Sequence, residues 1–201
     1  MDERVEISEL VKENEKLLAE AKPDKFVYCI LPSLKMLPIA IIWLIFDGFF
    51  ILQILPMFRT SMAFFLVPFF AIHLFPVYGV FTSYAKRRIE WNNLQYGITT
   101  QRVIRVGGAL GVEVQAIDHH EIDAVNIKMS WLEKLRHVGT LEIVSDSTRI
   151  DFVGIENPVK IYKMLTKTSF DVKTDIEYPN ALRPDENPGY KTRYKDETSG
   201  K

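Results

Sequence analysis

The sequence predicts an α+β membrane protein, in which a two-helix transmembrane hairpin precedes a small, bent antiparallel β-barrel or sandwich. Two almost unbroken apolar runs, at residues 36–55 and 62–83, each approach the ~20 residues that a helix needs to cross a bilayer. Short segments rich in Val, Ile and Thr follow, with the spacing of strands. An amphipathic segment from Asn157 onward predicts a C-terminal helix that caps the open end of the sheet.

The pattern divides the chain into four segments. We expect an amphipathic cytosolic helix over residues 1–25, the transmembrane hairpin over 26–88, the β domain over 89–170 and a disordered polar tail over 171–201. The first segment is expected to be a helix because apolar residues recur among charged ones at helical spacing. The tail is polar and proline-bearing and offers no apolar core.

Basic residues flank the two apolar runs unevenly. Six lie outside the two runs, toward the termini, and one lies in the connector between them. They are Lys22, Lys25 and Lys35 before the first run, Lys86, Arg87 and Arg88 after the second, and Arg59 in the connector. Lysine and arginine accumulate on the cytoplasmic side of spanning helices. The sequence therefore predicts an integral protein of the cell membrane with two spans and both termini in the cytoplasm.

Two polar residues interrupt the apolar runs, Asp47 in the first and His73 in the second. At ~1.5 Å of rise per residue, both fall roughly 15 Å from the cytoplasmic face, at matching depth on antiparallel helices. Ionisable groups at such depth are costly and face a partner. We expect the two side chains to meet, either as a structural contact or as a proton- or ion-linked site.

Composition excludes several functional classes. The 201 residues carry 25 Lys and Arg against 26 Asp and Glu, so no global charge favours nucleic acid. The single cysteine, Cys29, cannot form an intramolecular disulfide. The segment "DHHEID" at 118–123 holds adjacent histidines, which point to opposite faces of an extended chain, and we predict a polar loop with no metal. No phosphate loop, nucleophile elbow or paired catalytic carboxylate occurs, so we predict a non-enzyme without a cofactor.

The segments after residue 94 predict about six strands and two helices. The helix in "SWLEKLRHVG" opens with Ser130 and Glu133 at capping-box spacing, and Gly139 is placed to end it. The last helix has Asn157 as its N-cap and Pro158 at its first position. The predicted strands are "LQYGIT" and "RVIRV" around a turn at 99–101, then "VEVQAI", "IDAVNIKM", "TLEIVS" and "RIDFVGI".

Three of these stretches, in this order, resemble the bacterial pleckstrin-homology (PH) domain family of the type that adjoins transmembrane helices. They are "YGITTQRVIRVGG", "GTLEI" and "IDFVGIENPVKIYKML". The matching positions are Tyr96, Ile98, Thr99, Arg102, Val103, Ile104, Gly139, Thr140, Gly154, Ile155, Asn157 and Pro158. The resemblance covers about residues 36–168 and implies a bent seven-stranded barrel or sandwich capped by one helix.

Arg102 and Arg105 are the candidate contacts for a lipid headgroup or a partner. They follow the turn of the first hairpin, and eukaryotic PH domains bind inositol phosphates through a basic cluster in that hairpin. Residues 94–168 carry nine Lys and Arg against nine Asp and Glu, however, and phosphate recognition needs clustered cations. The alternative for Arg102 is a salt bridge within the domain.

Two functions stay open from the sequence. The first is a membrane-anchored, non-catalytic interaction module or scaffold that acts by self-assembly or by binding a cytosolic or membrane partner. The second is a small oligomeric membrane component with a proton- or ion-linked role for Asp47 and His73. The expected partners are the lipid bilayer and a protein that the sequence does not identify, with a homo-oligomer as an alternative and no nucleic acid.

Overall fold

The computed structural model describes residues 5–177 and divides into two compact units. Lys25–Ile89 form the helical unit, whereas Met1–Asp24 and Glu90–Lys201 together form the β unit. The β unit is therefore discontinuous in sequence, because the whole helical unit is inserted between two of its segments.

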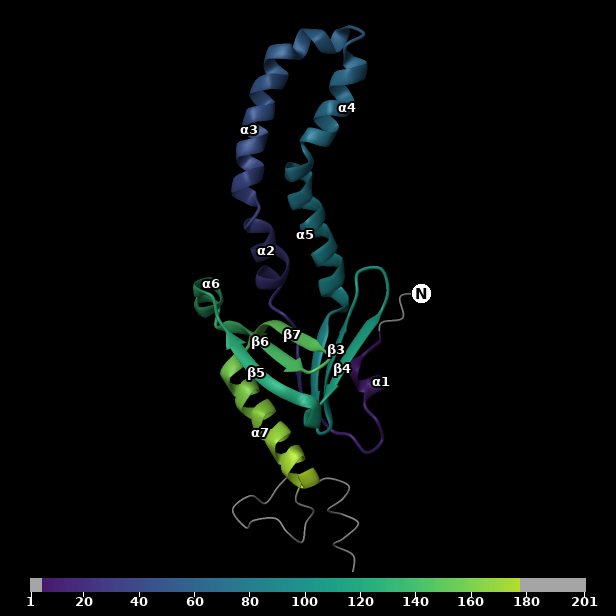
Figure 1. Cartoon of the computed structure of the whole chain (residues 1–201), viewed down its shortest axis with the longest axis vertical. Helices are drawn as coiled ribbons and strands as arrows, with labels where there is room; N and C mark the ends of the chain where they lie inside the picture. Colours follow the sequence, from purple (N-terminus) through teal and green to yellow (C-terminus); the bar gives the residue numbers. More distant parts are fainter. Residues whose placement is uncertain (1–4, 178–201) are drawn as a thin grey trace, which may run out of the picture. The chain divides into compact units, whose positions relative to one another are not determined.

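In the helical unit, two arms of helix run antiparallel and side by side (Figure 1). A short 3₁₀ turn, η2 (Leu55–Arg59), reverses the chain between them. The elements are η1 (Phe26–Ile30), α2 (Leu31–Leu34), α3 (Leu37–Ile54), α4 (Ala63–His73) and α5 (Phe75–Asn93), the last of which ends in the β unit.

Among the described residues, one helix is long and apolar enough to cross a membrane. It covers Leu37–Met57, 21 residues, and coincides with the first predicted span. The second predicted span is not a single straight helix, because α4 and α5 meet at Leu74 with a bend of 50° and satisfy the criterion only as a pair. A second crossing of the membrane stays a prediction.

The bend follows from Pro76, which has no N–H to donate to the preceding turn. The Val77 amide bonds to the Leu74 carbonyl, so the His73 carbonyl loses its usual partner within the helix. The Trp43 indole donates to the His73 carbonyl at 2.8 Å, and the Tyr78 hydroxyl donates to that of Ala71. Side chains thus satisfy the backbone carbonyls at the break.

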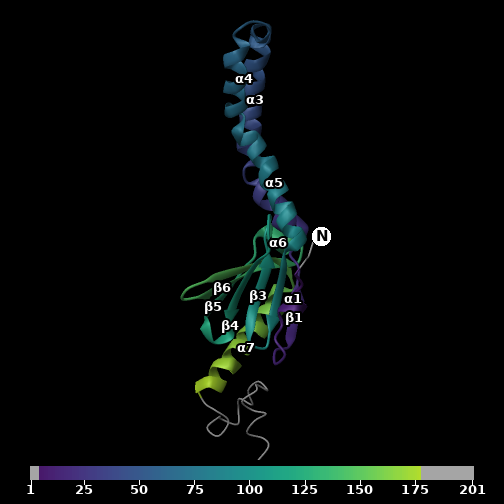
Figure 2. The ribbon, with the colours of Figure 1, turned by 90° about the vertical axis from the view of Figure 1, so that its right-hand side faces the viewer.

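Within residues 5–177, the β unit has two antiparallel sheets with seven strands in all; Figures 1 and 2 show how the sheets are arranged. The sheets form a sandwich and not a closed barrel, since each keeps two outer strands. The first sheet has the order β1 (Leu17–Ala21), β2 (Gln95–Thr99), β3 (Arg102–Gly107) and β4 (Glu113–Asp118); the second has β5 (Ile122–Lys128), β6 (Val138–Ser145) and β7 (Arg149–Glu156).

The prediction of one amphipathic helix over residues 1–25 is wrong. The described part of this segment holds only one helical turn, α1 (Ile7–Leu10), followed by strand β1. Ile7 is 1% exposed and packs with Ile104 and Val106, while Gly97 leaves room for it, since a Cβ there would lie 2.8 Å from Ile7 Cγ2. A partner strand, β2, is available in the folded chain, and tertiary pairing overrides a weak local helical pattern.

The core lies between the two sheets. Tyr96 of β2 stacks on Phe152 of β7 with ring centroids 4.4 Å apart, and its hydroxyl accepts a hydrogen bond from the Val153 amide at 3.1 Å. Helix α7 (Pro158–Glu177) covers the sandwich and buries Leu165. The tyrosine of the first stretch that resembles the PH family therefore joins the two sheets.

The tail prediction over 171–201 needs correction at its start. Helix α7 continues through Glu177, where Asp171 is buried and the Lys173 ammonium donates to the Ile122 carbonyl at 2.7 Å. These contacts make residues 171–177 part of the β unit. The rest of the predicted tail, residues 178–201, lies outside the described residues.

Helix α6 (Trp131–Leu135) has the predicted capping box, with Ser130 and Glu133 each bonding the other's backbone N–H. Gly139 does not end this helix, contrary to expectation. The chain leaves it through His137, whose φ of 57° is left-handed, and Gly139 lies in β6. A Cβ on Gly139 would stand 2.7 Å from the Met129 side chain and 2.9 Å from that of Pro158.

Candidate functional site

The structure brings the two polar residues of the apolar runs together. His73 Nδ1 lies 2.8 Å from Asp47 Oδ1, and Asp47 is only 1% exposed. Trp43 lies one helical turn before Asp47, and its indole N–H donates to the backbone carbonyl of His73. The centroids of the Trp43 and His73 rings are 5.3 Å apart. Phe69 also stacks on the His73 ring, with ring centroids 5.2 Å apart. The pair is therefore fixed in position by aromatic neighbours.

A small cavity of about 240 Å³ adjoins this pair. Its walls are apolar apart from the pair itself, formed by Phe46, Asp47, Phe50, Ile54, Leu66, Phe69, Phe70 and His73. The second carboxylate oxygen, Asp47 Oδ2, is buried without a hydrogen-bond partner among the described residues. Buried carboxylate oxygens normally have partners, so this atom is the part of the pair with unused capacity to accept a proton or a donor.

Arg102 is engaged within the β unit. Its Nε and Nη2 lie 3.1 and 3.3 Å from the two oxygens of Glu15, and Nη2 also donates to the Leu10 carbonyl at 2.9 Å. Glu15 accepts further bonds from the Thr99 hydroxyl at 2.5 Å and from the Lys12 amide at 3.1 Å. Arg102 therefore ties the N-terminal segment to the β2–β3 turn.

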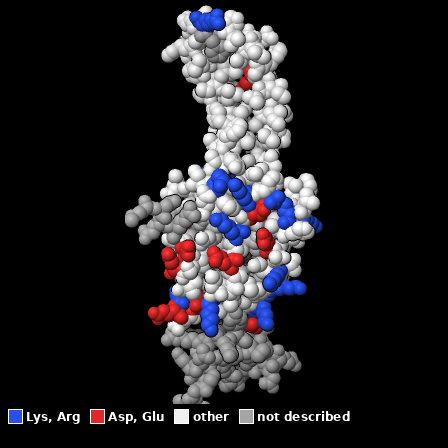
Figure 3. All heavy atoms as spheres, turned by 180° about the vertical axis from the view of Figure 1, so that it is seen from behind, with Lys and Arg blue, Asp and Glu red and all other residues white. Residues whose placement is uncertain are grey.

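Arg105 has two acceptors, Glu90 Oε1 at 3.0 Å and Gln115 Oε1 at 3.3 Å. The guanidinium groups of Arg102 and Arg105 thus both bind acceptors inside the β unit. Positive and negative side chains alternate over the face of the β unit in Figure 3, with no broad basic patch there. Neither arginine offers a free guanidinium for a headgroup, and such a role stays a prediction.

The two adjacent histidines take opposite environments. His119 is fully buried, its Nε2 donates to the Thr99 carbonyl at 2.8 Å, and its Nδ1 lies 3.2 Å from the Ser169 hydroxyl. Burial lowers the pKa of His119 despite that carbonyl and nearby carboxylates, so the ring is neutral and Nδ1 accepts from Ser169. His120 is exposed, and no group of metal-ligating side chains occurs in the described residues.

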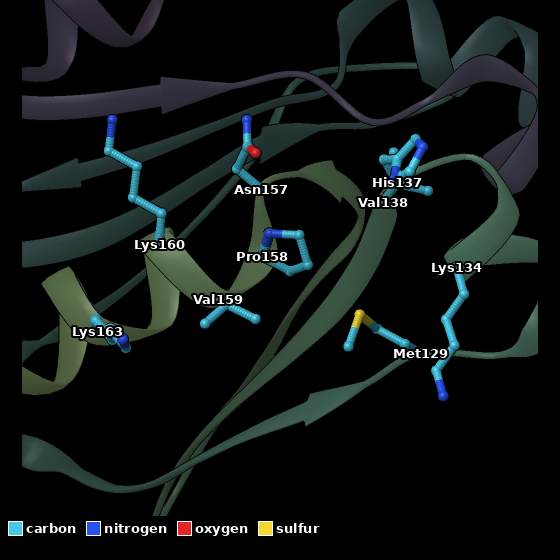
Figure 4. A pocket seen from close by; sticks show the side chains of 9 residues that line it. All are labelled: Met129, Lys134, His137, Val138, Asn157, Pro158, Val159, Lys160 and Lys163. Atoms are coloured by element: carbon cyan, nitrogen blue, oxygen red, sulfur yellow. The ribbon is translucent and has the colours of Figure 1, made fainter.

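A pocket of about 610 Å³ lies where α7 begins, beside the end of β5 and the start of β6 (Figure 4). Its walls combine apolar surface with basic side chains: Met129, Lys134, His137, Val138, Asn157, Pro158, Val159, Lys160 and Lys163. Its three lysines form no ion pair with any acidic side chain among residues 5–177. We call this the lysine pocket.

The backbone around the lysine pocket is set by local sequence. His137 and Asn157 both have positive φ, at 57° and 49°, and asparagine is among the residues that tolerate this conformation best. The Asn157 carbonyl accepts the amides of Lys160 and Ile161, which starts α7 as the sequence predicted. Helix N-termini and lysines both favour negative charge, so the pocket suits an acidic group with an apolar part.

Sequence reasoning missed the lysine pocket. Its lysines are separated along the chain and lie on α6 and α7, so no basic cluster is visible in the sequence. The signal that was available is the pair Gly139 and Pro158, which belong to two of the resembling stretches and meet at this pocket.

An N-terminal strand, two bent antiparallel sheets and a capping C-terminal helix define a PH-like domain. The sequence matches the bacterial PH domain family over residues 27–168, and the chain belongs to that family. PH domains are in general non-catalytic, and membership indicates an interaction module. The match also includes most of the inserted helical unit.

Other comparisons are distant. No curated protein matches the sequence. A crystal structure of a DUF1696 family protein with a pleckstrin-homology domain, from Shewanella loihica PV-4, aligns with 39% of this chain and 72% of its own. The alignment has 13% identity and a TM-score of 0.33, too low to support a conclusion about this chain.

Replacing Glu15 by Gln should make the β unit less stable at neutral pH by roughly 1 to 3 kcal/mol, since Arg102 loses a charged acceptor. Burial opposes ionisation of Glu15, but the Thr99 hydroxyl, the Lys12 amide and Arg102 outweigh it and lower the pKa of the Glu15 carboxyl. A lowered pKa stabilises the fold fully above the ordinary pKa of glutamate, and this stabilisation is lost as pH falls through the pKa of the folded state.

The difference in the free energy of unfolding between wild type and Glu15→Gln should therefore become smaller as the pH is lowered. Urea unfolding of the solubilised full-length chain, from neutral pH into the acid range, measures it. Glu20→Gln, at an exposed position of β1, is the matched control and should change little at any pH. If Glu15→Gln lowered the free energy of unfolding by the same amount at every pH, the ionised Glu15 bound to Arg102 would not be the source of the stability.

Leucine at position 47 or position 73 should weaken the helical unit, because each leaves the other polar group unpaired. Polar contacts between helices in membranes average ~0.6 kcal/mol and reach about 1.7 kcal/mol, so we expect coupling of that size in a double-mutant cycle. A second cycle that pairs Asp47→Leu with Thr82→Val is the control and should show no coupling. The Thr82 hydroxyl donates to the Gly79 carbonyl of its own helix at 3.2 Å and has no other hydrogen bond among residues 5–177. Strictly additive losses for Asp47 and His73 would show that their contact contributes nothing.

Proposed function

We propose that the chain is a membrane-anchored PH-domain protein that acts as a non-catalytic interaction module. In this proposal the helical unit crosses the bilayer twice, and the β unit lies on the cytoplasmic side. The observation that carries the proposal is the pairing of β1 with β2, which precede and follow the helical unit.

This pairing restricts the path of the inserted helices. Ala21 lies opposite Tyr96 in one sheet, so the chain must leave and return on the same side of a membrane. An even number of crossings is then required. Since α3 has the length and composition of a span, the bent pair of α4 and α5 supplies the return.

The side follows from charge. The basic residues near both ends of the helical unit outnumber the single Arg59 at its turn, which favours a cytoplasmic β unit. Between Lys35 and Lys86, the only ionisable side chains of the Asp, Glu, Lys, Arg and His types are Asp47, Arg59 and His73. That composition suits a segment enclosed by lipid.

The lysine pocket is the surface that we propose for the partner. Its three lysines and apolar walls favour a protein segment that carries acidic and apolar side chains. Self-assembly is the alternative, in which such a segment belongs to a second copy of the chain.

Labelling of single cysteines in intact cells tests the anchor, in a chain that lacks Cys29. We expect Ser8→Cys and Ser147→Cys, both exposed in the β unit, to be protected from an impermeant maleimide added outside. Ser61→Cys, in the turn between α3 and α4, should react. Reaction at position 147, or protection at all three sites with labelling only after lysis, would refute the two-span topology.

A photo-cross-linking residue at Val159 tests the pocket in native membranes. We expect a defined adduct that Lys160→Glu with Lys163→Glu reduces several-fold, because the acidic group of the partner would then be repelled. Lys167→Glu is the matched control, on an exposed position of α7 that does not line the pocket, and should leave the adduct unchanged. An adduct that is insensitive to all of these charges would exclude the lysine pocket as the binding surface.

A second function, a proton- or ion-linked role in the membrane, has one observation in its favour. Asp47 Oδ2 is buried without a partner among the described residues, next to the small cavity. Under this proposal, loss of Asp47 would remove a pH-dependent phenotype while protein level and topology stay normal. Under the first proposal, the contact serves only to hold the two arms of the helical unit together.

A further inference from the structure

Two apolar protrusions stand out on the β unit. The first is the β3–β4 loop, in which Leu110 is 102% and Val112 is 50% exposed. The second is α6, in which Trp131 is 74% and Leu135 is 71% exposed. Each of these four residues is at least half exposed.

Both protrusions have a set conformation. In the loop, Gly108 has a φ of 123°, and a Cβ there would collide with the Gly111 carbonyl oxygen, so the turn depends on glycine. In α6, the capping box holds the start of the helix, and the Thr140 hydroxyl donates to Glu133 at 2.9 Å. The apolar tips are therefore presented by ordered segments.

Each protrusion is bonded to a residue next to the inserted helical unit. The Asn93 side-chain amide donates to the Gly108 carbonyl at 3.3 Å, and Asn93 is four positions after Ile89, where the helical unit ends. Arg136, which follows α6, binds both oxygens of Asp24 at 3.1 and 2.7 Å, and Asp24 directly precedes the helical unit. The two protrusions thus lie beside the two points at which the chain leaves the β unit for the helical unit and comes back to it.

The register of the first sheet gives the same placement for the loop. Gln95, at the start of β2, lies opposite Val106, near the end of β3. The start of β2 and the β3–β4 loop therefore lie at the same end of the strands. From Arg88, the last basic residue at the expected membrane surface, to Asn93 is about 8 Å along helix α5. This distance is within the thickness of a headgroup layer and the side chains that enter it.

We propose that Leu110, Val112, Trp131 and Leu135 form a lipid-contact rim that inserts into the interfacial layer of the bilayer. The proposal rests on the membrane anchor proposed above. Tryptophan favours this layer because its ring is apolar and its indole N–H is polar. The rim orients the β unit on the membrane surface, in addition to the anchor that holds it there.

Spin labels on single cysteines of the full-length chain test the rim, in nanodiscs of phosphatidylcholine and phosphatidylglycerol and with Cys29→Ala as background. The test positions are Leu110→Cys and Leu135→Cys, with Val112→Cys and Trp131→Cys as second variants. The water controls are Ser147→Cys and Gln101→Cys. They lie in exposed turns, β6–β7 and β2–β3, at the ends of the strands opposite to the two protrusions. The lipid control is Phe64→Cys, on α4 and 79% exposed.

We expect the ratio of relaxation by oxygen to relaxation by a water-soluble nickel chelate to be several-fold higher at both test positions than at the water controls. A ratio equal to that of Ser147→Cys, or a high ratio at only one protrusion, would overturn the rim. Shielding from both reagents would also overturn it and would indicate contact with a second copy.

The lipid control separates this inference from the proposed function. Phe64→Cys should be accessible to oxygen and not to nickel if the helical unit spans the bilayer. A normal result at Phe64 with water-like test positions refutes the rim alone. A water-like result at Phe64 refutes the anchor, and the rim with it.

Discussion

The pairing of β1 with β2 is the constraint on which the other features depend. It joins the two segments of the β unit that the helical unit separates in sequence, and it completes the first sheet. Glu15 and Arg102 secure the same junction at the β2–β3 turn, with the carboxylate enclosed and its pKa lowered. Without this closure, Ile7 would leave the cluster with Ile104 and Val106, and the helical unit would no longer have its two ends held together.

The strands after residue 94, the capping box and the start of α7 were predictable because their signals are local. Alternation of apolar residues, Ser130 with Glu133, and Asn157 with Pro158 each act within a few residues. The PH-like fold followed from the order of these stretches, and the family match confirms it. Among the candidate site residues, Asp47 and His73 were found because ionisable groups are rare in apolar runs, and the structure places them in contact.

Features that depend on distant parts of the chain were not predictable. Strand β1 carries a helical pattern and becomes a strand only because β2 lies beside it. The lysine pocket combines α6, β6 and α7, and its lysines gain their common surface from the fold. Gly139 was interpreted as a helix stop, yet its lack of a side chain makes room for Met129 and Pro158. In each case the residues that determine the local structure are far away in sequence, or the chain reaches the position through a turn with a positive φ.

The discontinuity of the β unit also fixes an order of events during synthesis. The ribosome makes β1 before the helical unit and β2 after it, so β1 stays without its partner strand while the helices are produced. At ≈ 5–20 residues per second, that interval lasts seconds, which is long compared with the microseconds in which a hairpin forms. A strand that waits with unsatisfied backbone groups is open to wrong pairing, and β1 is short, with Glu13, Lys16 and Glu20 exposed on and before it. Charged side chains at such an edge oppose pairing with other strands.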